Sequence, residues 1–291
     1  MSNAEMPPIL VGLDPDPDKR TALAWAADEA HDTGFPLLLV LARGLAGHAR
    51  VHRTALAKLS EEGRRVLDSA VDFVARAHPE VPVATRLVED DPAQALRRQA
   101  EQAAMAVLST RRPDAGEGWT VSSPVVGPVL KHARCPVVVV RESARSADSP
   151  PFFLVGVDGS EPSRHALEFA FRFAAVRGAS LRAVHAWWPP LFGAADERTA
   201  MAEAGRLLAE QVAEPSSRFP QVPVEKRVIY GHAVETLVEA GVGARGVVVG
   251  SRGRGGFAGM VLGSVSQGLL HHAAGPVVVV PGSADPERFT R

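Results

Sequence analysis

A glycine-rich segment near the C-terminus carries the clearest chemical signal in the sequence. Five glycines follow Gly250 within 13 residues, directly after the aliphatic run Val247–Val249. Glycine permits positive φ angles and lets backbone amides approach a ligand closely. Ser264 then begins a predicted helix, whose first amides and dipole favour an anion. These residue types in this order predict a loop that binds phosphate.

Two better-known phosphate motifs are excluded. No Gly-x-x-x-x-Gly-Lys-Ser/Thr sequence occurs, so the segment is not a Walker A loop. The run Gly253–Ala258 fits the Gly-x-Gly-x-x-Ala form of the dinucleotide fingerprint, but it follows a fourth strand and lacks the acidic residue expected about 20 positions later. The serine also has a structural alternative, because Ser264 and Gln267 have the spacing of a capping box.

The composition limits the classes of protein to which the chain can belong. Its 291 residues suggest two domains, and 46% hydrophobic with 22% charged residues is typical of a globular protein. A net charge of −1 produces no overall electrostatic field that would attract nucleic acid or anionic lipid. One cysteine, Cys135, excludes an intrachain disulfide and a multi-cysteine zinc site. No apolar run is long enough for a membrane span and no secretory signal is recognisable, so we expect a cytoplasmic protein.

The chain contains a long internal repeat. Ile9–Asp14 returns as Phe153–Asp158, and Cys135–Val140 returns as Gly275–Val280. A polar, proline-ended stretch separates the copies. We therefore predict an N-terminal domain over residues 1–142, a linker over 143–151 and a C-terminal domain over 152–291.

Each copy alternates short aliphatic runs with longer helical patterns. Continuous Val and Leu runs are typical of parallel strands buried on both faces, and this alternation predicts an α/β fold with a doubly wound sheet in each copy. Ligands bind such sheets beyond the carboxyl ends of the strands, where the strand order reverses. In the second copy the predicted strands are 152–158, 180–186, 222–229, 245–250 and 276–280, and the predicted helices are 162–177, 194–213, 233–243 and 264–273.

The spacing Gly250-x2-Gly253-x9-Gly263-Ser264, together with Val155–Ser160, resembles the ATP-binding class of the universal stress protein family. The resemblance covers nearly the whole chain as two tandem copies. It implies five-stranded parallel sheets of order 3-2-1-4-5, flanked by helices. It also implies that Asp158 contacts the adenosine end of ATP and that the backbone of Ala186 contacts adenine. The residues implied around the ribose and phosphates are Gly156, Val249, Gly250, Arg252, Gly253, Arg254, Gly263, Ser264, Val265 and Ser266.

The first copy departs from this pattern. The residues aligned with Gly250, Gly253, Gly263 and Ser264 are Ser109, Arg112, Ser122 and Ser123. Its loop also carries Asp114 and Glu117, which would repel a polyanion. Ser123-Pro124 has the pattern of a helix cap followed by proline at the first helical position. We therefore predict one nucleotide per chain, in the C-terminal copy.

The function that the sequence favours is a nucleotide-dependent regulator of the stress response. No general base or nucleophile pair accompanies the loop, so no catalytic residue is predicted. The adjacent His271 and His272 point in different directions on a helix, so no metal site is predicted either. The alternatives are a slow ATPase or self-phosphorylating protein that uses Ser160 or Ser264, and a nucleotide-free interaction scaffold. A loop that binds phosphate through its backbone does not determine how many phosphates the nucleotide carries. AMP and ADP therefore stay alternatives to ATP, and Mg²⁺ would accompany ATP.

The predicted partners follow from the remaining apolar segments. The strands Val137–Val140 and Val277–Val280 are edge strands that need pairing. In the resembled family such strands pair between subunits, so we expect the two copies to form a pseudo-dimer and the chain to form a homodimer. Trp187-Trp188 favours packing or contact with an unidentified protein partner. No nucleic acid or membrane is expected as a partner.

Overall fold

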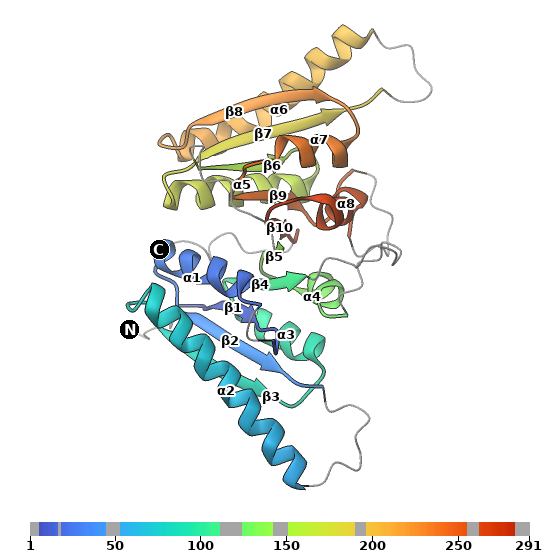
Figure 1. Ribbon diagram of the computed structural model, residues 1–291. Coiled ribbons are helices and arrows are strands. Elements are labelled where there is room, and N and C mark those ends of the chain that lie inside the picture. Colours follow the sequence, from blue (N-terminus) through green and yellow to red (C-terminus); the bar gives the residue numbers. More distant parts are fainter. Residues whose placement is uncertain are drawn as a thin grey trace. The chain divides into compact units, whose positions relative to one another are not determined.

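The computed structural model describes residues 6–16, 19–44, 53–110, 124–141, 151–189, 196–254 and 262–282. The chain divides into two compact units, Met1–Glu142 and Ser143–Arg291. Each unit is a parallel sheet with helices on both faces (Figure 1). None of the described helices is long and apolar enough to cross a membrane.

The N-terminal unit has the strand order β3-β2-β1-β4-β5, with every neighbouring pair parallel. Helices α1 and α2 pack against each other, and so do α3 and α4. The elements are β1 (Ile9–Gly12), α1 (Thr21–Thr33), β2 (Leu37–Ala42), α2 (Arg53–Ala77), β3 (Val83–Val88), α3 (Pro92–Ala100), β4 (Met105–Thr110), α4 (Val126–His132) and β5 (Val137–Arg141).

The C-terminal unit repeats this topology as β8-β7-β6-β9-β10, again with parallel neighbours. The predicted order 3-2-1-4-5 and the doubly wound α/β fold are therefore confirmed in both units. The elements are β6 (Phe152–Gly156), α5 (Glu161–Val176), β7 (Ser180–Trp187), α6 (Glu197–Arg218), β8 (Val224–Tyr230), α7 (Ala233–Ala240), β9 (Gly246–Gly250), α8 (Ser264–His272) and β10 (Val277–Val280).

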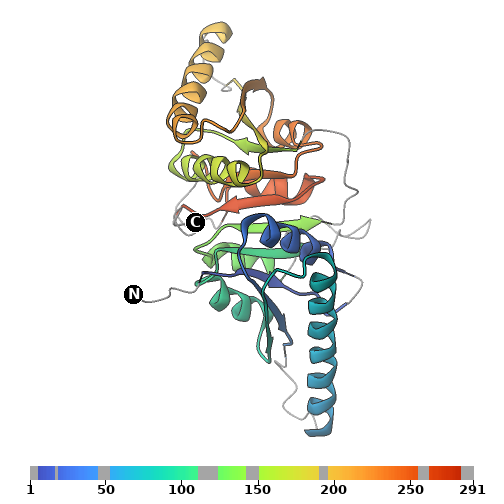
Figure 2. The same ribbon diagram turned by 90° about the vertical axis from the view of Figure 1, so that its left-hand side faces the viewer.

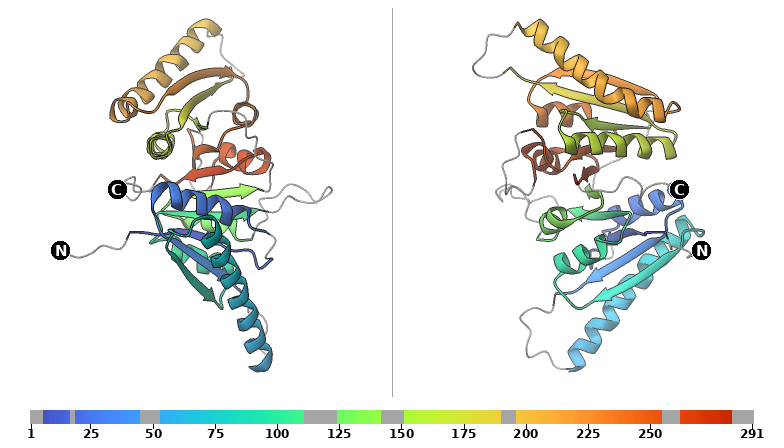
Figure 3. Two further views of the ribbon diagram at one scale, coloured as in Figure 1. Left: turned by 60° about the vertical axis from the view of Figure 1, so that its left-hand side comes forward. Right: turned by 180° about the vertical axis from the view of Figure 1, so that it is seen from behind.

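The aliphatic strands form the centre of each core. Val247–Val249 and Val277–Val280 are at most 3% exposed, because helices cover both faces of the sheet (Figures 2 and 3). On one face of the C-terminal sheet α5 packs on α6, and on the other α7 packs on α8. Phe153 and Phe173 meet edge to face beneath α5, with ring centroids 4.8 Å apart. Burial of the apolar side chains in this core is the main source of the stability of the unit.

Several predicted helix boundaries were wrong, among them the end of the helix predicted over 233–243, which stops at Ala240. The helix predicted to end at residue 213 continues through Pro215 to Arg218 as α6. Pro215 has no amide to donate, but hydrogen bonding resumes after it, because the Phe219 amide donates to the Pro215 carbonyl at 2.9 Å. In the N-terminal unit α4 begins at Val126 with Val125 as its N-cap, so Pro124 is not the first helical residue. Ser123, predicted as the cap, lies outside the described residues.

Candidate functional site

The candidate site lies where the strand order of the C-terminal sheet reverses. β6 and β9 are neighbours, with Val155 opposite Val248. From β6 the chain crosses through α5 to β7 on one side, and from β9 it crosses through α8 to β10 on the other. The two crossovers diverge above the carboxyl ends of β6 and β9, the position at which doubly wound sheets bind ligands. The segments 156–160 and 250–254 both begin there.

Asp158 joins these two segments. Its Oδ1 accepts the backbone amide of Ser160 at 2.9 Å, and its Oδ2 accepts the backbone amide of Arg254 at 3.1 Å. The Asp158 amide in turn donates to Ser163 Oγ at 3.1 Å. The aspartate therefore anchors the start of the glycine-rich loop to the turn after β6, a role that the sequence analysis did not predict.

The anchor yields the first testable prediction. In Asp158→Ala the Arg254 amide loses its acceptor, so hydrogen exchange in residues 250–254 should become about tenfold faster, which corresponds to about 1.4 kcal/mol. Asp14 is the matched control, because it occupies the same position after β1 and accepts the Asp16 amide at 2.9 Å. Exchange in residues 250–254 should stay unchanged in Asp14→Ala. Equal exchange rates in both variants would show that Asp158 does not hold the loop.

Close packing explains two glycines of the predicted loop. A Cβ atom at Gly250 would lie 2.7 Å from the backbone carbon and oxygen of Pro162, in the first turn of α5. A Cβ atom at Gly253 would lie 2.5 Å from Asp158 Oδ2. Real Cβ atoms do not approach other atoms so closely, so Gly250 requires glycine because its neighbour is backbone, whereas a side chain at position 253 would displace the Asp158 carboxylate. The spacing of these glycines is therefore explained by packing within the protein as well as by room for a ligand.

The N-terminus of α8 is open. Gly263 is the N-cap, no side chain among the described residues caps the helix, and Ser264 is exposed at the first helical position. The capping box expected for Ser264 and Gln267 is therefore wrong, because Gly263 occupies the cap. By contrast, the N-terminus of α5 is capped by Ser160, whose Oγ accepts the Ser163 amide at 3.3 Å. Of these two helix ends at the switch point, α8 is the one that presents uncapped amides and a positive dipole end.

The loop and the start of α8 lie side by side. The Gly263 amide donates to the Ser251 carbonyl at 2.8 Å, and the Cβ position of Gly263 lies 3.3 Å from the Arg252 Cα. Arg252 and Arg254 are exposed. An Arg254 guanidinium nitrogen lies 2.7 Å from the Cβ position of Gly159, whose φ is +80°. Two cationic residues, Arg252 beside Gly263 and Arg254 beside Gly159, therefore lie at the switch point.

Val249 and Ser266 lie in the core of the unit, beneath the loop. Val249 is 3% exposed and Ser266 is 2% exposed. The Ser266 hydroxyl donates to the Gly250 carbonyl at 2.7 Å and so ties α8 to the end of β9. The structure thus directs both predicted side chains into the protein instead of toward a ligand, because each fills the core beneath the loop. Gly156 is half-buried at the end of β6, and Val265 is half-buried in the first turn of α8.

Ala186 lies near the end of β7, and its backbone amide and carbonyl point toward β6. The Val184 carbonyl accepts the Val157 amide at 2.9 Å, so the residue two positions later also directs its backbone toward β6. β6 has already ended at Gly156, so the backbone of Ala186 faces the space above that strand. The neighbouring His185 is buried and has its Nδ1 2.6 Å from the Val157 carbonyl oxygen.

An aromatic patch of Trp187, Trp188, Tyr230 and His232 covers the ends of β7 and β8. Trp188 stacks on His232 with ring centroids 4.0 Å apart and lies 5.1 Å from Tyr230. Trp188 is 46% exposed and Tyr230 is 50% exposed. The two tryptophans stand out in the sequence, but Tyr230 does not, because only the pairing between β7 and β8 brings it beside them.

The equivalent position of the N-terminal unit is built differently. Asp14 keeps the turn after β1, but α1 begins only at Thr21 and its N-cap, Arg20, makes no side-chain cap. Ser109, aligned with Gly250, has the same strand pairing, with Val140 opposite it as Val280 is opposite Gly250, but it carries a side chain where Gly250 has none. The remaining loop residues expected to block phosphate, Arg112, Asp114, Glu117, Ser122 and Ser123, lie outside the described residues.

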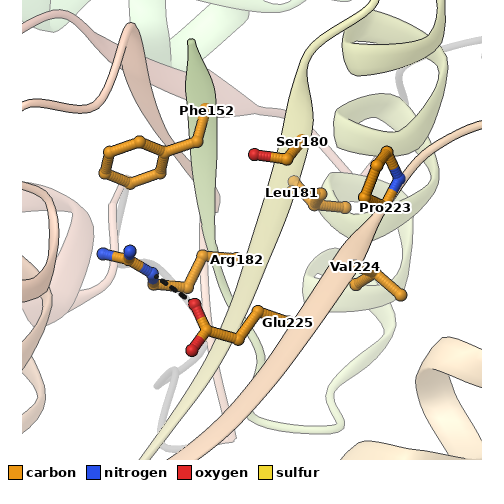
Figure 4. Close-up of a pocket in the computed structure, with 7 residues that line it drawn as sticks. All are labelled: Phe152, Ser180, Leu181, Arg182, Pro223, Val224 and Glu225. Atoms are coloured by element: carbon orange, nitrogen blue, oxygen red, sulfur yellow. Dashed lines mark hydrogen bonds and ion pairs between the residues drawn. The ribbon is translucent and has the colours of Figure 1, made fainter. Parts of the chain in front are cut away.

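A shallow hollow of about 210 Å³ lies at the opposite end of the C-terminal sheet. It is lined by the first residues of β6, β7 and β8, among them Phe152 and Val224 (Figure 4). Arg182 lies over the Phe152 ring at 4.3 Å and donates to Glu225 at 3.0 Å. These paired side chains account for the hollow, and it is separate from the switch point.

Comparisons with known proteins agree with the repeat and the fold. The model of the universal stress protein family matches the chain twice, over residues 6–141 and 153–281. A universal stress protein of Mycobacterium tuberculosis is 34% identical over 293 residues, which cover 93% of this chain and 95% of that protein. A universal stress protein of Mycolicibacterium smegmatis is 36% identical over 286 residues, which cover 94% and 96%.

A solved structure shares the architecture. The crystal structure of a universal stress protein from Archaeoglobus fulgidus superposes with a TM-score of 0.70 over 94% of this chain and 95% of that chain. Its sequence identity of 18% makes it evidence for the fold alone. Together with the double family match, these similarities show that the chain belongs to the universal stress protein family and carries two of its domains in tandem.

Proposed function

We propose that the C-terminal unit binds one ATP per chain and that the bound nucleotide regulates the contacts of this protein during stress. The observation that carries the proposal is the uncapped N-terminus of α8 beside the anchored loop at the switch point. Helix N-termini bind phosphate through free amides and the helix dipole. Arg252 and Arg254 supply positive charge at the rim of the same site.

The geometry supports a definite orientation for the nucleotide. The phosphates would lie on the first-turn amides of α8, with Ser264 as an additional donor. Adenine would lie toward β7, where the backbone of Ala186 offers both a donor and an acceptor above the end of β6. Asp158 would lie between these ends, and we assign it an anchoring role in addition to the adenosine contact implied by the family resemblance.

We further propose that the protein is a regulator and not a dedicated hydrolase. Both carboxylate oxygens of Asp158 accept backbone amides, and the Ser160 hydroxyl caps α5. These contacts hold the two groups in structural roles and so disfavour them as a general base and a nucleophile. Phosphate release from ATP should therefore stay below about one turnover per minute, far under ordinary enzyme rates.

The stoichiometry provides the main test. The purified chain should release about one adenine nucleotide per chain on heat denaturation, because the N-terminal copy has Ser109 and Arg112 in place of Gly250 and Gly253 and carries Asp114 and Glu117, which would repel phosphate. Chromatography with mass detection of the supernatant counts the nucleotide and separates ATP, ADP and AMP. Light scattering of the same preparation should give the mass of a homodimer.

Two outcomes would contradict the proposal. Two nucleotides per chain would show that the N-terminal unit also binds a nucleotide, and would contradict the prediction that Ser109 and Arg112 prevent binding there. No nucleotide, even after incubation with ATP and Mg²⁺, would leave a nucleotide-free scaffold as the better description of the protein.

A further inference from the structure

Two histidines and a glutamate that are distant in sequence meet on the N-terminal unit. His31 lies in the last turn of α1, and His78 and Glu80 lie in the turn that follows α2. Each offers a potential metal-ligating atom, and these atoms lie within 4.8 Å of one another. The two imidazole rings are stacked with centroids 4.6 Å apart. Figure 1 shows the C-terminal ends of α1 and α2 close together at this point.

We propose that His31, His78 and Glu80 form a binding site for a divalent transition-metal ion of the Zn²⁺ type. Imidazole nitrogen and carboxylate oxygen are the donors that such ions prefer, and two histidines with one carboxylate are a recurrent ligand set. Three protein ligands would leave the remaining coordination position to water. The site is separate from the proposed nucleotide site and does not depend on it.

The distances fit a metal ion placed among the three donors. Ligands bound at about 2.0–2.1 Å in tetrahedral geometry lie about 3.3 Å from one another. Glu80 Oε1 lies 2.5 Å from His31 Nδ1 and 3.9 Å from His78 Nδ1, so the two distances bracket this value. The two Glu80 distances would each need to change by less than about 1 Å to reach this value, and no two of the three donor atoms are more than 4.8 Å apart.

Asp28 supplies an independent indication. His78 Nε2 lies 3.0 Å from Asp28 Oδ1, on the side of the ring opposite Nδ1. A metal-bound histidine characteristically donates its other ring N–H to a carboxylate, which fixes the tautomer and directs the lone pair toward the metal. This contact would leave the Nδ1 lone pair of His78 directed toward Glu80. A cation between the two groups would relieve the repulsion between that lone pair and the carboxylate.

The surroundings also favour positive charge. Both histidines lie at the C-terminal ends of helices, where the helix dipole attracts cations. Glu80 and His31 are 56% and 51% exposed in their side chains, so an ion can reach the cluster from solvent.

The test is a calorimetric titration of the full chain with ZnCl₂, after treatment with a chelator and without a polyhistidine tag. One Zn²⁺ should bind per wild-type chain, and His31→Gln/His78→Gln should abolish this binding. The double variant His271→Gln/His272→Gln removes the same number of imidazoles elsewhere and should bind like the wild type. Asp28→Asn should weaken binding about tenfold, because it alters only the partner of His78.

Two further readouts keep the test decisive. Circular dichroism without zinc establishes that each variant is folded. Co²⁺ bound in place of Zn²⁺ should give a visible absorption band in the wild type that the His31→Gln/His78→Gln variant lacks. No zinc binding by the wild type would show an ion-pair cluster only, and undiminished binding by that variant would place the metal elsewhere. Either result would overturn the proposal.

Discussion

In Ser264→Glu the affinity of the chain for ATP should fall at least about a hundredfold, with no loss of folding stability. The substitution places a carboxylate at the first position of α8, beside the proposed phosphates. Two like charges about 4 Å apart repel by about 4 kcal/mol at an effective dielectric constant near 20, and a hundredfold change corresponds to about 2.7 kcal/mol. The same carboxylate interacts favourably with the helix dipole, so α8 itself should not be weakened.

Two controls isolate the charge. Ser264→Ala removes only the hydroxyl and should weaken binding less than tenfold, because the backbone amides remain. Gln267→Glu introduces the same charge on an exposed residue one turn farther along α8 and should have a smaller effect than Ser264→Glu. Calorimetry with ATP and Mg²⁺ measures all three affinities. Wild-type affinity in Ser264→Glu would show that the phosphates do not lie at this helix end.

Gly253→Glu would be a less informative variant. A Cβ atom there would lie 2.5 Å from Asp158 Oδ2, so any side chain would press on the anchor of the loop. A loss of ATP binding in that variant would not separate charge repulsion from displacement of Asp158. Ser264 avoids this difficulty because its side chain is already exposed.

The second large effect is expected for Gly250→Ala. The added methyl group would lie 2.7 Å from the backbone of Pro162, which the first turn of α5 holds in place. Overpacking of this kind costs about 1–3 kcal/mol, and because the contact is with backbone we expect a loss of about 2–3 kcal/mol in the unfolding free energy of the C-terminal unit. ATP binding should weaken as well, since α5 and β9 must move apart beneath the loop.

Gly246→Ala is the matched control. Gly246 lies on the same strand, and its Cβ position is 3.6 Å from the Phe153 ring, an ordinary contact. Its unfolding free energy should stay within about 0.5 kcal/mol of the wild type. Urea denaturation followed by tryptophan fluorescence compares the two variants. Equal stability of both would contradict the close packing of β9 on α5.

The fold could be predicted from the sequence because its signals are local and occur twice. Short aliphatic runs such as Val277–Val280 alternate with helical patterns, and the second copy repeats the pattern of the first. The predicted strands of the C-terminal unit agree with the structure to within a few residues. The helix predicted over 194–213 extends instead to Arg218, with a buried proline, Pro215, inside it.

The details of the site were less accessible, because they depend on contacts between distant segments. The Asp158–Arg254 hydrogen bond and the approach of Gly250 to Pro162 arise only when β6 and β9 become neighbours. The sequence indicated a serine cap for α8, but Gly263 occupies that position. His31 and Glu80 were not linked beforehand, since only the packing of α1 beside α2 brings them together.

Hydrogen exchange with and without ATP tests the central claim most directly, because it reports on the backbone amides that are proposed to bind phosphate. Residues 250–254 and 262–267 of the wild-type chain should become protected when ATP and Mg²⁺ are added, while residues 105–110 and 124–132 of the N-terminal unit should not change. Protection confined to the N-terminal unit, or no protection at the start of α8, would contradict the account.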